Sequence, residues 1–211
     1  MTDKEAGAGG QPRGEDFYLA NFRILANVLF ALCMFSSVLK IEFTADLSDE
    51  EILPYIWASL DAFANFVVAF VFLAMYWIKF IGKLHHLVKS DTRLLLIWLV
   101  YMAVLCVYPF GENLIGNYPG SPPAQITFSV IWAALGILGF LSWWYAYQAR
   151  LIDPYLKEET ARRLLWESFP EPVAALISIP FAFYSDAGYY AALLLVIPAN
   201  YLIARRFSDN D

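Results

Sequence analysis

Catalysis and metal binding need side chains that can be poised close together, and this sequence offers few of them. The two histidines, His85 and His86, are adjacent, and neighbouring residues of a helix point to different sides, which argues against joint metal ligation. The two cysteines, Cys33 and Cys106, lie within long apolar runs, where cysteine is usually a small packing residue. No paired carboxylates and no nucleophile with a nearby base can be identified. We therefore predict no enzyme activity, no small-molecule substrate, no metal site and no cofactor.

A few polar side chains lie inside the apolar runs. Asp61 is followed at i+4 by Asn65, which places both on one helix face. An ionisable residue at membrane depth needs a partner or a water-filled cavity, so Asp61 is either a functional residue, in one version the proton site of a coupled transporter, or an interfacial carboxylate that reaches outward. Glu167 and Glu171 flank Pro170, a pattern typical of an ordinary helix N-terminus.

The composition indicates a membrane protein. Hydrophobic residues make up 60% of the chain, aromatic residues 18% and charged residues 16%, whereas soluble domains are roughly half apolar and about a quarter charged. A helix needs about 20 apolar residues to cross the hydrocarbon core. On this basis we expect an all-α, polytopic protein with six transmembrane helices. Their approximate ranges are 18–41, 53–81, 93–110, 125–148, 168–184 and 188–205.

The loops between these runs alternate in charge. The first, third and fifth loops carry mainly acidic residues, and the second and fourth loops and the end of the chain carry basic ones. Cytoplasmic loops are enriched in Lys and Arg, so we expect both termini in the cytoplasm. The net charge of −6 and the scattered basic residues do not favour nucleic acid as a partner. The basic residues are Lys79, Lys83, Lys89, Arg93, Arg150, Lys157, Arg162, Arg163, Arg205 and Arg206.

The ends of the chain are polar. Residues 1–16 are glycine-rich and predict a disordered cytoplasmic tail, residues 17–207 form the six-helix transmembrane domain, and 208–211 form a second short tail. The first apolar run starts near Phe17, has no small-residue cleavage site and is long enough to span, so we expect no cleavable signal. The predicted location is the cell membrane (inner or plasma), multi-pass, with lipid as a partner.

The first span carries a stripe that is polar at the cytoplasmic end and apolar beyond it. At about 100° per residue, Arg23, Asn27, Met34, Val38 and Ile41 share this stripe, and Ser37 lies at its edge. Such a stripe could line a narrow pore if several copies surrounded an axis. The alternative, which the first span on its own favours, is a helix-packing face on which Arg23 reaches back to the cytoplasmic interface.

The chain resembles the transmembrane protein 175 family of bacterial and endolysosomal potassium channels. The resemblance rests on the order and spacing of short segments from the second span onward, and it implies six helices per bacterial subunit, a homotetramer and a pore lined by the first helix of each subunit. The segments are Phe66 to Trp77, Asp91, Tyr108-Pro109-Phe110, Gly116-Asn117-Tyr118-Pro119, Pro172 and Pro198.

The family signatures are only partly present. The first-helix signature is RxxxFSD, of which Arg23 is present while Asn27, Val28 and Leu29 occupy the FSD positions. Of a WxxH pair in the second helix, Trp77 is present and Phe80 occupies the histidine position. The resemblance implies that Arg23 and Trp77 anchor the pore helix, with Asn27 available to hydrogen-bond a neighbouring helix.

The same resemblance implies which residues would form the pore. Counting from Arg23 without gaps places the narrowest apolar constriction at Met34, with Val38 and Ile41 further outward, while Asn27 and Ser37 would be polar lining residues. A ring of apolar side chains can gate by dewetting. We therefore expect a potassium-preferring leak channel that is a homotetramer, K⁺ being the permeant ion. The alternative is a non-conducting assembly or regulatory protein on the same scaffold.

Overall fold

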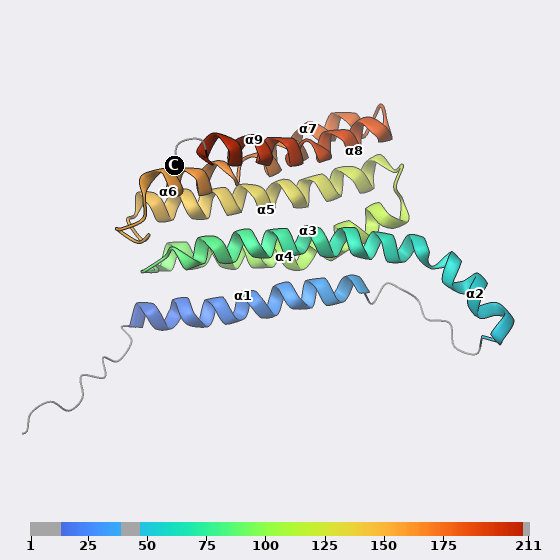
Figure 1. The fold of residues 1–211 in the computed structure, drawn as a ribbon, viewed down its shortest axis with the longest axis horizontal. Helices are drawn as coiled ribbons and strands as arrows, with labels where there is room; N and C mark the ends of the chain where they lie inside the picture. Colours follow the sequence, from blue (N-terminus) through green and yellow to red (C-terminus); the bar gives the residue numbers. More distant parts are fainter. Residues whose placement is uncertain (1–13, 39–46, 209–211) are drawn as a thin grey trace, which may run out of the picture.

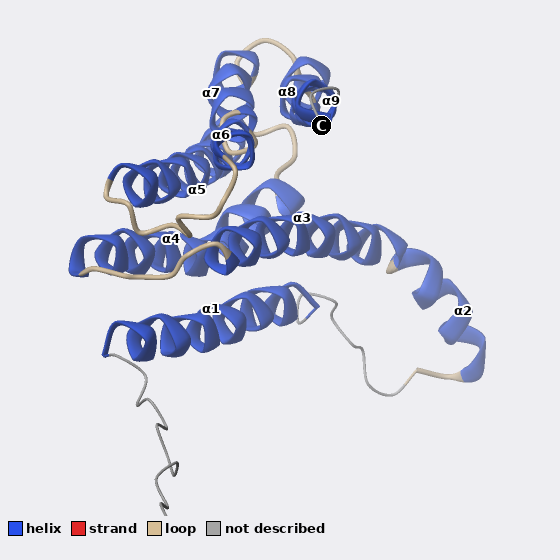
Figure 2. Cartoon of the chain, turned by 60° about the vertical axis from the view of Figure 1, so that its left-hand side comes forward, coloured by secondary structure: helices blue, strands red, loops and turns tan. Residues whose placement is uncertain are grey.

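The computed structural model describes residues 14–38 and 47–208, and within these residues every regular element is a helix (Figure 1, Figure 2). The first helix begins at Gly14, three residues before the predicted start of the transmembrane domain. The helices are α1 (Gly14–Val38), α2 (Asp49–Ala58), α3 (Leu60–His85), α4 (Thr92–Asn117), α5 (Pro122–Gln148), α6 (Glu158–Trp166), α7 (Pro170–Phe181), α8 (Asp186–Leu194) and α9 (Val196–Ser208).

The long helices run alongside one another in a layered bundle. Helix α1 packs against α3 and α4, α4 packs against α5, α5 packs against α7, and α7 packs against α8 and α9. The start of α1, the α3–α4 and α5–α6 connections and the end of α9 lie at one end of the bundle (Figure 1). The two connections are joined there, because Leu87 and Ile152 form a β-bridge. This arrangement agrees with the predicted topology, in which these basic connections and both termini share the cytoplasmic side.

Five described segments are long and apolar enough to cross a membrane, and the chain is a helical, polytopic membrane protein, as predicted. The exception among the six predicted spans is 168–184. It is helical only over the 12 residues of α7, which reach about 18 Å, short of the ~30 Å hydrocarbon core. The five segments are Phe17–Val38, Ala62–His85, Thr92–Asn117, Pro122–Gln148 and Asp186–Phe207.

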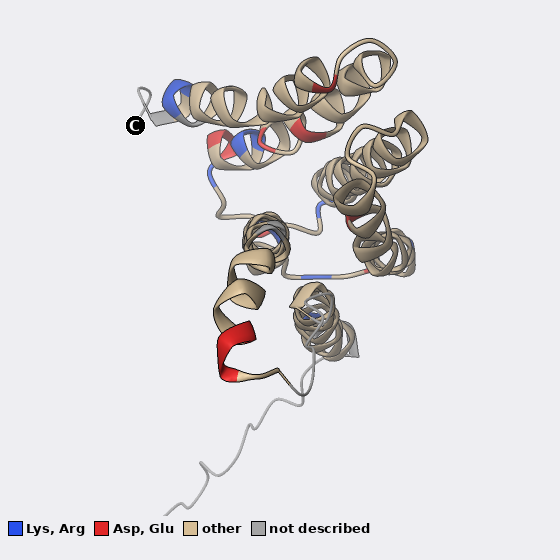
Figure 3. Cartoon of the chain, turned by 90° about the vertical axis from the view of Figure 1, so that its right-hand side faces the viewer, with Lys and Arg blue, Asp and Glu red and all other residues tan. Residues whose placement is uncertain are grey.

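The predicted second span, 53–81, is divided at Ser59 into α2 and α3. The Ser59 hydroxyl donates to the carbonyl of Tyr55 (2.9 Å), so it satisfies a backbone group at the end of α2. Three acidic residues, Asp49, Glu50 and Glu51, stand in the first turn of α2 (Figure 3), where carboxylates interact favourably with the helix dipole. The membrane-crossing part of α3 runs from Ala62 to His85, so it ends four residues later than the predicted span. Lys79 and Lys83, which we predicted in a loop, lie inside this helix.

Helices α3 and α4 lie further apart than helices α1 and α4. Large side chains fill the space between them: the ring of Phe80 stacks on Tyr101, with centroids 5.2 Å apart, and meets Trp98 edge-on at 6.1 Å. Phe72 contacts Trp132 of α5 in the same way, at 5.5 Å. The position of α3 in the bundle is thus set by long side chains rather than by close backbone contact.

Helices α5 and α7, in contrast, touch closely at Gly136. A Cβ atom added at this glycine would lie 2.5 Å from Cδ of Pro172 and 2.9 Å from its backbone nitrogen. Both atoms belong to a rigid ring in the first turn of α7, so they cannot move aside as a flexible side chain would. The absence of a side chain at Gly136 is therefore what lets these two helices pack.

We expect Gly136→Ala to lower the free energy of unfolding by about 1–3 kcal/mol, the usual cost of overpacking. Thermal unfolding in detergent micelles measures the effect. The matched control is Gly82→Ala, because a Cβ at Gly82 of α3 would meet nothing within 4 Å and alanine favours a helix over glycine. Equal melting temperatures for the two variants would contradict the proposed close contact.

Candidate functional site

One face of α1 is buried against the rest of the subunit. Its buried residues recur every three or four positions, the spacing of an amphipathic helix face, and Phe22 stacks on Trp98 of α4 with centroids 4.8 Å apart. The opposite side of α1 exposes apolar side chains such as Ile24 and Leu32. The buried face consists of Leu19, Phe22, Ala26, Phe30, Cys33 and Ser37.

Two hydrogen bonds hold the cytoplasmic half of α1 to α3. The Arg23 guanidinium donates to the carbonyl of Leu84 (2.7 Å) in the last turn of α3, which also accepts the backbone N–H of Leu87 (3.3 Å). The indole N–H of Trp77 donates to Oδ1 of Asn27 (2.9 Å). The structure thus brings together Arg23, Asn27 and Trp77, the three residues of the degenerate signatures that still carry polar groups. At the lost histidine position, Phe80 packs instead among aromatic rings.

The outer half of α1 is held to α4. The Ser37 hydroxyl donates to Oε2 of Glu112 (3.0 Å), and the Cys33 thiol points to the carbonyl of Leu105 (3.5 Å). Ser37 is only 1% exposed. The sequence predicts a pore-lining position for Ser37, but in the subunit this residue belongs to the α1–α4 contact, because its hydroxyl finds its acceptor there.

The other predicted pore residues lie along the edge of α1 that borders α3. Met34 and Val38 are half-buried, and Met34 packs against the core. Asn27 is on the same edge and is engaged by Trp77. Ile41 lies outside the described residues, as do the side chains of Asp61 and Asn65 within α3.

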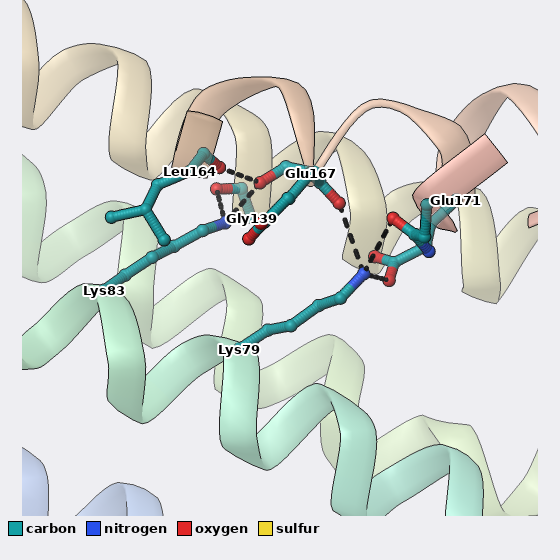
Figure 4. A network of polar contacts seen from close by, with 8 residues as sticks. Lys79, Lys83, Gly139, Leu164, Glu167 and Glu171 are labelled. Carbon is teal, nitrogen blue, oxygen red and sulfur yellow. Dashed lines mark hydrogen bonds and ion pairs between the residues drawn. The ribbon is translucent and has the colours of Figure 1, made fainter. Parts of the chain in front are cut away.

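The structure also reveals a buried polar cluster that we did not predict as a site from the sequence (Figure 4). From α3, Lys79 and Lys83 extend toward the turn that separates α6 from α7 (Figure 4). Lys79 Nζ lies 2.5 Å from Oε1 of Glu171 and also donates to the carbonyl of Glu167 (3.2 Å). Lys83 Nζ donates to the hydroxyl of Ser168 and to the carbonyl of Gly139 (3.0 Å) in α5.

This cluster satisfies groups that a break in a membrane helix would leave without partners. Glu167 ends α6 and Glu171 lies in the first turn of α7, so the lysines supply donors to the turn and neutralise a carboxylate that is 7% exposed. Glu171, predicted to be an ordinary helix-capping acid, is therefore an ion-pair partner. The usable sequence signal was the i, i+4 spacing of two lysines at the end of an apolar run.

No cluster of three metal-ligating side chains of the His, Cys, Asp and Glu types occurs in the described part of the chain. The fold and the buried contacts define a polytopic helical membrane protein whose first helix is held to its neighbours by hydrogen bonds along its length. Comparison with known proteins shows which family this chain is similar to.

Residues 22–109, which cover α1 from Phe22 through most of α4, match the family described as endosomal/lysosomal potassium channel TMEM175. A crystal structure of a variant of the potassium channel MtTMEM175, solved with a nanobody–MBP fusion protein, has the same fold: its TM-score is 0.65, its identity is 14%, and the match covers 99% of each chain. No match was found among curated proteins. The match over residues 22–109 supports the predicted resemblance to the TMEM175 family, whose description is that of a potassium channel rather than an enzyme.

We expect Glu171→Leu to lower the free energy of unfolding by about 3 kcal/mol, because it leaves the Lys79 ammonium buried without its carboxylate. In the double variant Lys79→Met/Glu171→Leu the loss should be much smaller than the sum of the two single losses. The exposed pair Arg162–Glu158 provides the control: Glu158→Gln should change stability by less than about 1 kcal/mol. Additive losses at Lys79 and Glu171 would contradict a coupled pair.

We expect Trp77→Phe to lower the free energy of unfolding by about 1 kcal/mol, because it removes the N–H that binds Asn27 but retains an aromatic ring. In a cycle with Asn27→Leu, the second substitution should cost little once the first is made. Trp144→Phe, at a half-exposed position of α5, is the control for the change in ring size. Independent effects at Trp77 and Asn27 in unfolding experiments would show that the hydrogen bond does not stabilise α1.

Proposed function

We propose that the chain is one subunit of a potassium-preferring cation leak channel in which the first helices of four identical subunits line the pore. The observation that carries this proposal is the family match. The matched segment, 22–109, contains every described residue of the predicted pore stripe, from Arg23 to Val38.

The geometry of α1 supports this proposal. One helix cannot enclose a channel, so a pore requires several copies around an axis. Met34 and Val38 are only half-covered by their own subunit, which leaves part of each side chain available to the other copies. The hydrogen bonds of Arg23 and Asn27 to α3 would fix the rotation of α1 about its own axis, so that the same stripe faces the pore in every subunit.

The chemistry of the stripe suggests how ions would be selected. A ring of four methionine side chains would exclude fully hydrated ions and could gate by dewetting, so that an ion passes only after losing part of its hydration shell. Methionine is flexible and its thioether is a weak ligand, so we propose a lower selectivity for potassium over sodium than a ring of branched aliphatic residues would give. The acids at the start of α2 would raise the local cation concentration at the outer mouth, an effect that salt screens. We assign the channel to the cell membrane.

We expect purified protein in liposomes to support a potassium flux, and Met34→Asn to raise this flux several-fold, because a polar ring stays hydrated where an apolar ring dewets. Met34→Ala, which widens the same ring, should raise the flux and weaken the preference for potassium over sodium. The measurement is potassium-driven proton uptake reported by a pH-sensitive dye in the presence of a protonophore.

Leu32→Ala is the matched control, since Leu32 lies about 160° from Met34 around the helix and is exposed. It should leave the potassium flux near that of the unmodified protein. A wild-type flux no larger than that of empty liposomes would contradict the channel and favour a non-conducting assembly protein. A wild-type flux that the Met34 variants do not change would refute the proposed constriction.

A further inference from the structure

A small cavity of about 30 Å³ lies between α3, α4, α5 and the start of α7, beside the polar cluster of Figure 4. A volume of roughly 10–15 Å³ is enough for one water molecule, so this cavity has room for one or two water-sized species. Lys79, Lys83 and Glu171 line it together with aromatic rings of α3 and α4. It is therefore a small space with charged groups on one side and apolar groups on the other.

The charged side chains that line the cavity do not balance. Lys79 is paired with the carboxylate of Glu171. Lys83 donates to the hydroxyl of Ser168 and to the carbonyl of Gly139 (3.0 Å), and both of these acceptors are neutral. The described lining thus contains two ammonium groups and one carboxylate, which leaves one positive charge in excess.

The charges just outside the cavity do not correct this excess. Besides Glu171, Glu167 is the carboxylate that acts on Lys83, and it pairs with Arg163 (3.3 Å). The guanidinium of Arg23 adds a further positive charge beside the end of α3, where it also binds a neutral carbonyl. A buried ammonium group without a counter-charge is costly. An anion in the cavity would therefore stabilise the folded subunit.

Tyr101 offers a second donor at the same place. Its side chain is 2% exposed and lines the cavity, and its hydroxyl has no hydrogen-bond partner among the described residues. A Cβ atom added at Gly139 would lie 3.8 Å from Nζ of Lys83 and 3.8 Å from Cε2 of Tyr101. The ammonium group and the edge of the phenol ring therefore both face the space that the missing side chain of Gly139 leaves open.

We propose that this cavity binds a monatomic anion, chloride, between the ammonium group of Lys83 and the hydroxyl of Tyr101. The volume excludes phosphate and larger anions, and the excess positive charge excludes a cation. A water molecule would fit, but it would leave the charge of Lys83 uncompensated. The ion would enter from the predicted cytoplasmic side, because Lys83 lies in the last turn of α3. Neither the family description nor the structural neighbour assigns a ligand to this place.

Thermal unfolding of the full chain in detergent micelles tests the proposal, with sodium gluconate replaced stepwise by sodium chloride at constant ionic strength. Gluconate is too large for the cavity, so only chloride should stabilise the fold. We expect the melting temperature to rise by about 3–6 °C for each tenfold increase in chloride above its dissociation constant. Such an increase is worth about 1.4 kcal/mol, and 1 kcal/mol shifts the melting temperature of a chain of this size by about 2–4 °C. A melting temperature that does not depend on the anion would overturn the proposal and leave water as the occupant.

Gly139→Ala tests the position of the ion. The added Cβ makes only ordinary contacts, at 3.8 Å, and the backbone carbonyl that Lys83 binds is retained, but the methyl group takes up the space between Lys83 and Tyr101. We expect the dependence on chloride to be lost. Gly82→Ala is the matched control, because a Cβ there meets nothing within 4 Å, and it should keep the full dependence. An equal chloride effect in both variants and in the unmodified protein would indicate a general salt effect and overturn the proposal.

Tyr101→Phe tests the second donor. The variant removes only the hydroxyl and keeps the ring that stacks on Phe80. We expect it to weaken chloride binding at least about tenfold, since a hydrogen bond to a charged group is worth roughly 1.5–3 kcal/mol and 1.4 kcal/mol is tenfold. In gluconate the same variant should be no less stable than the unmodified protein, because this hydroxyl has no other described partner. Equal stability losses in gluconate and in chloride would contradict a role in binding the ion. These measurements require no ion flux, so their outcome is independent of whether the chain conducts.

Discussion

The two lysines of α3 make the contact on which the arrangement of the bundle most depends. Inside a membrane no water is available to solvate an ammonium group or the free carbonyls of an interrupted helix. Lys79 and Lys83 meet both needs at once, since they bind the turn between α6 and α7 and the carboxylate of Glu171. Helix α3 is thereby tied to the second half of the chain through long side chains, although its backbone stays at a distance.

The wide spacing between α3 and α4 has a consequence at each end of α3. Toward the cytoplasmic end, the space is filled by the rings of Phe80, Trp98 and Tyr101, which occupy the region where the family signature would place a histidine. Toward the outer end, large side chains fill it only in part, and an apolar cavity beside Glu112 remains. The same feature therefore explains a packed aromatic core toward one end of the bundle and an apolar cavity toward the other.

Helix α1 is positioned by bonds to two different partners. Arg23 and Asn27 bind α3, and Ser37 and Cys33 face α4. The motif comparison singled out Arg23, Asn27 and Trp77 because each stands at a recognisable spacing, and the structure places all three at the contact between α1 and α3. It could not show that Ser37 turns to α4, since the periodicity of one helix says which residues share a face but not which neighbour covers it.

The sequence by itself determined that the chain is helical, crosses the membrane several times and has basic connections on one side, because these properties follow from the transfer free energy of each apolar run and the charges that flank it. Only the tertiary structure decided where α3 ends, why the run 168–184 is helical only over α7 and how two lysines are satisfied inside the bundle. The acceptors of Lys79 and Lys83 lie far along the chain, in 139–200. A lysine inside a membrane-spanning helix is stable only when the fold brings acceptors next to it. The local sequence pattern around Lys79 and Lys83 does not show which distant residues these acceptors are.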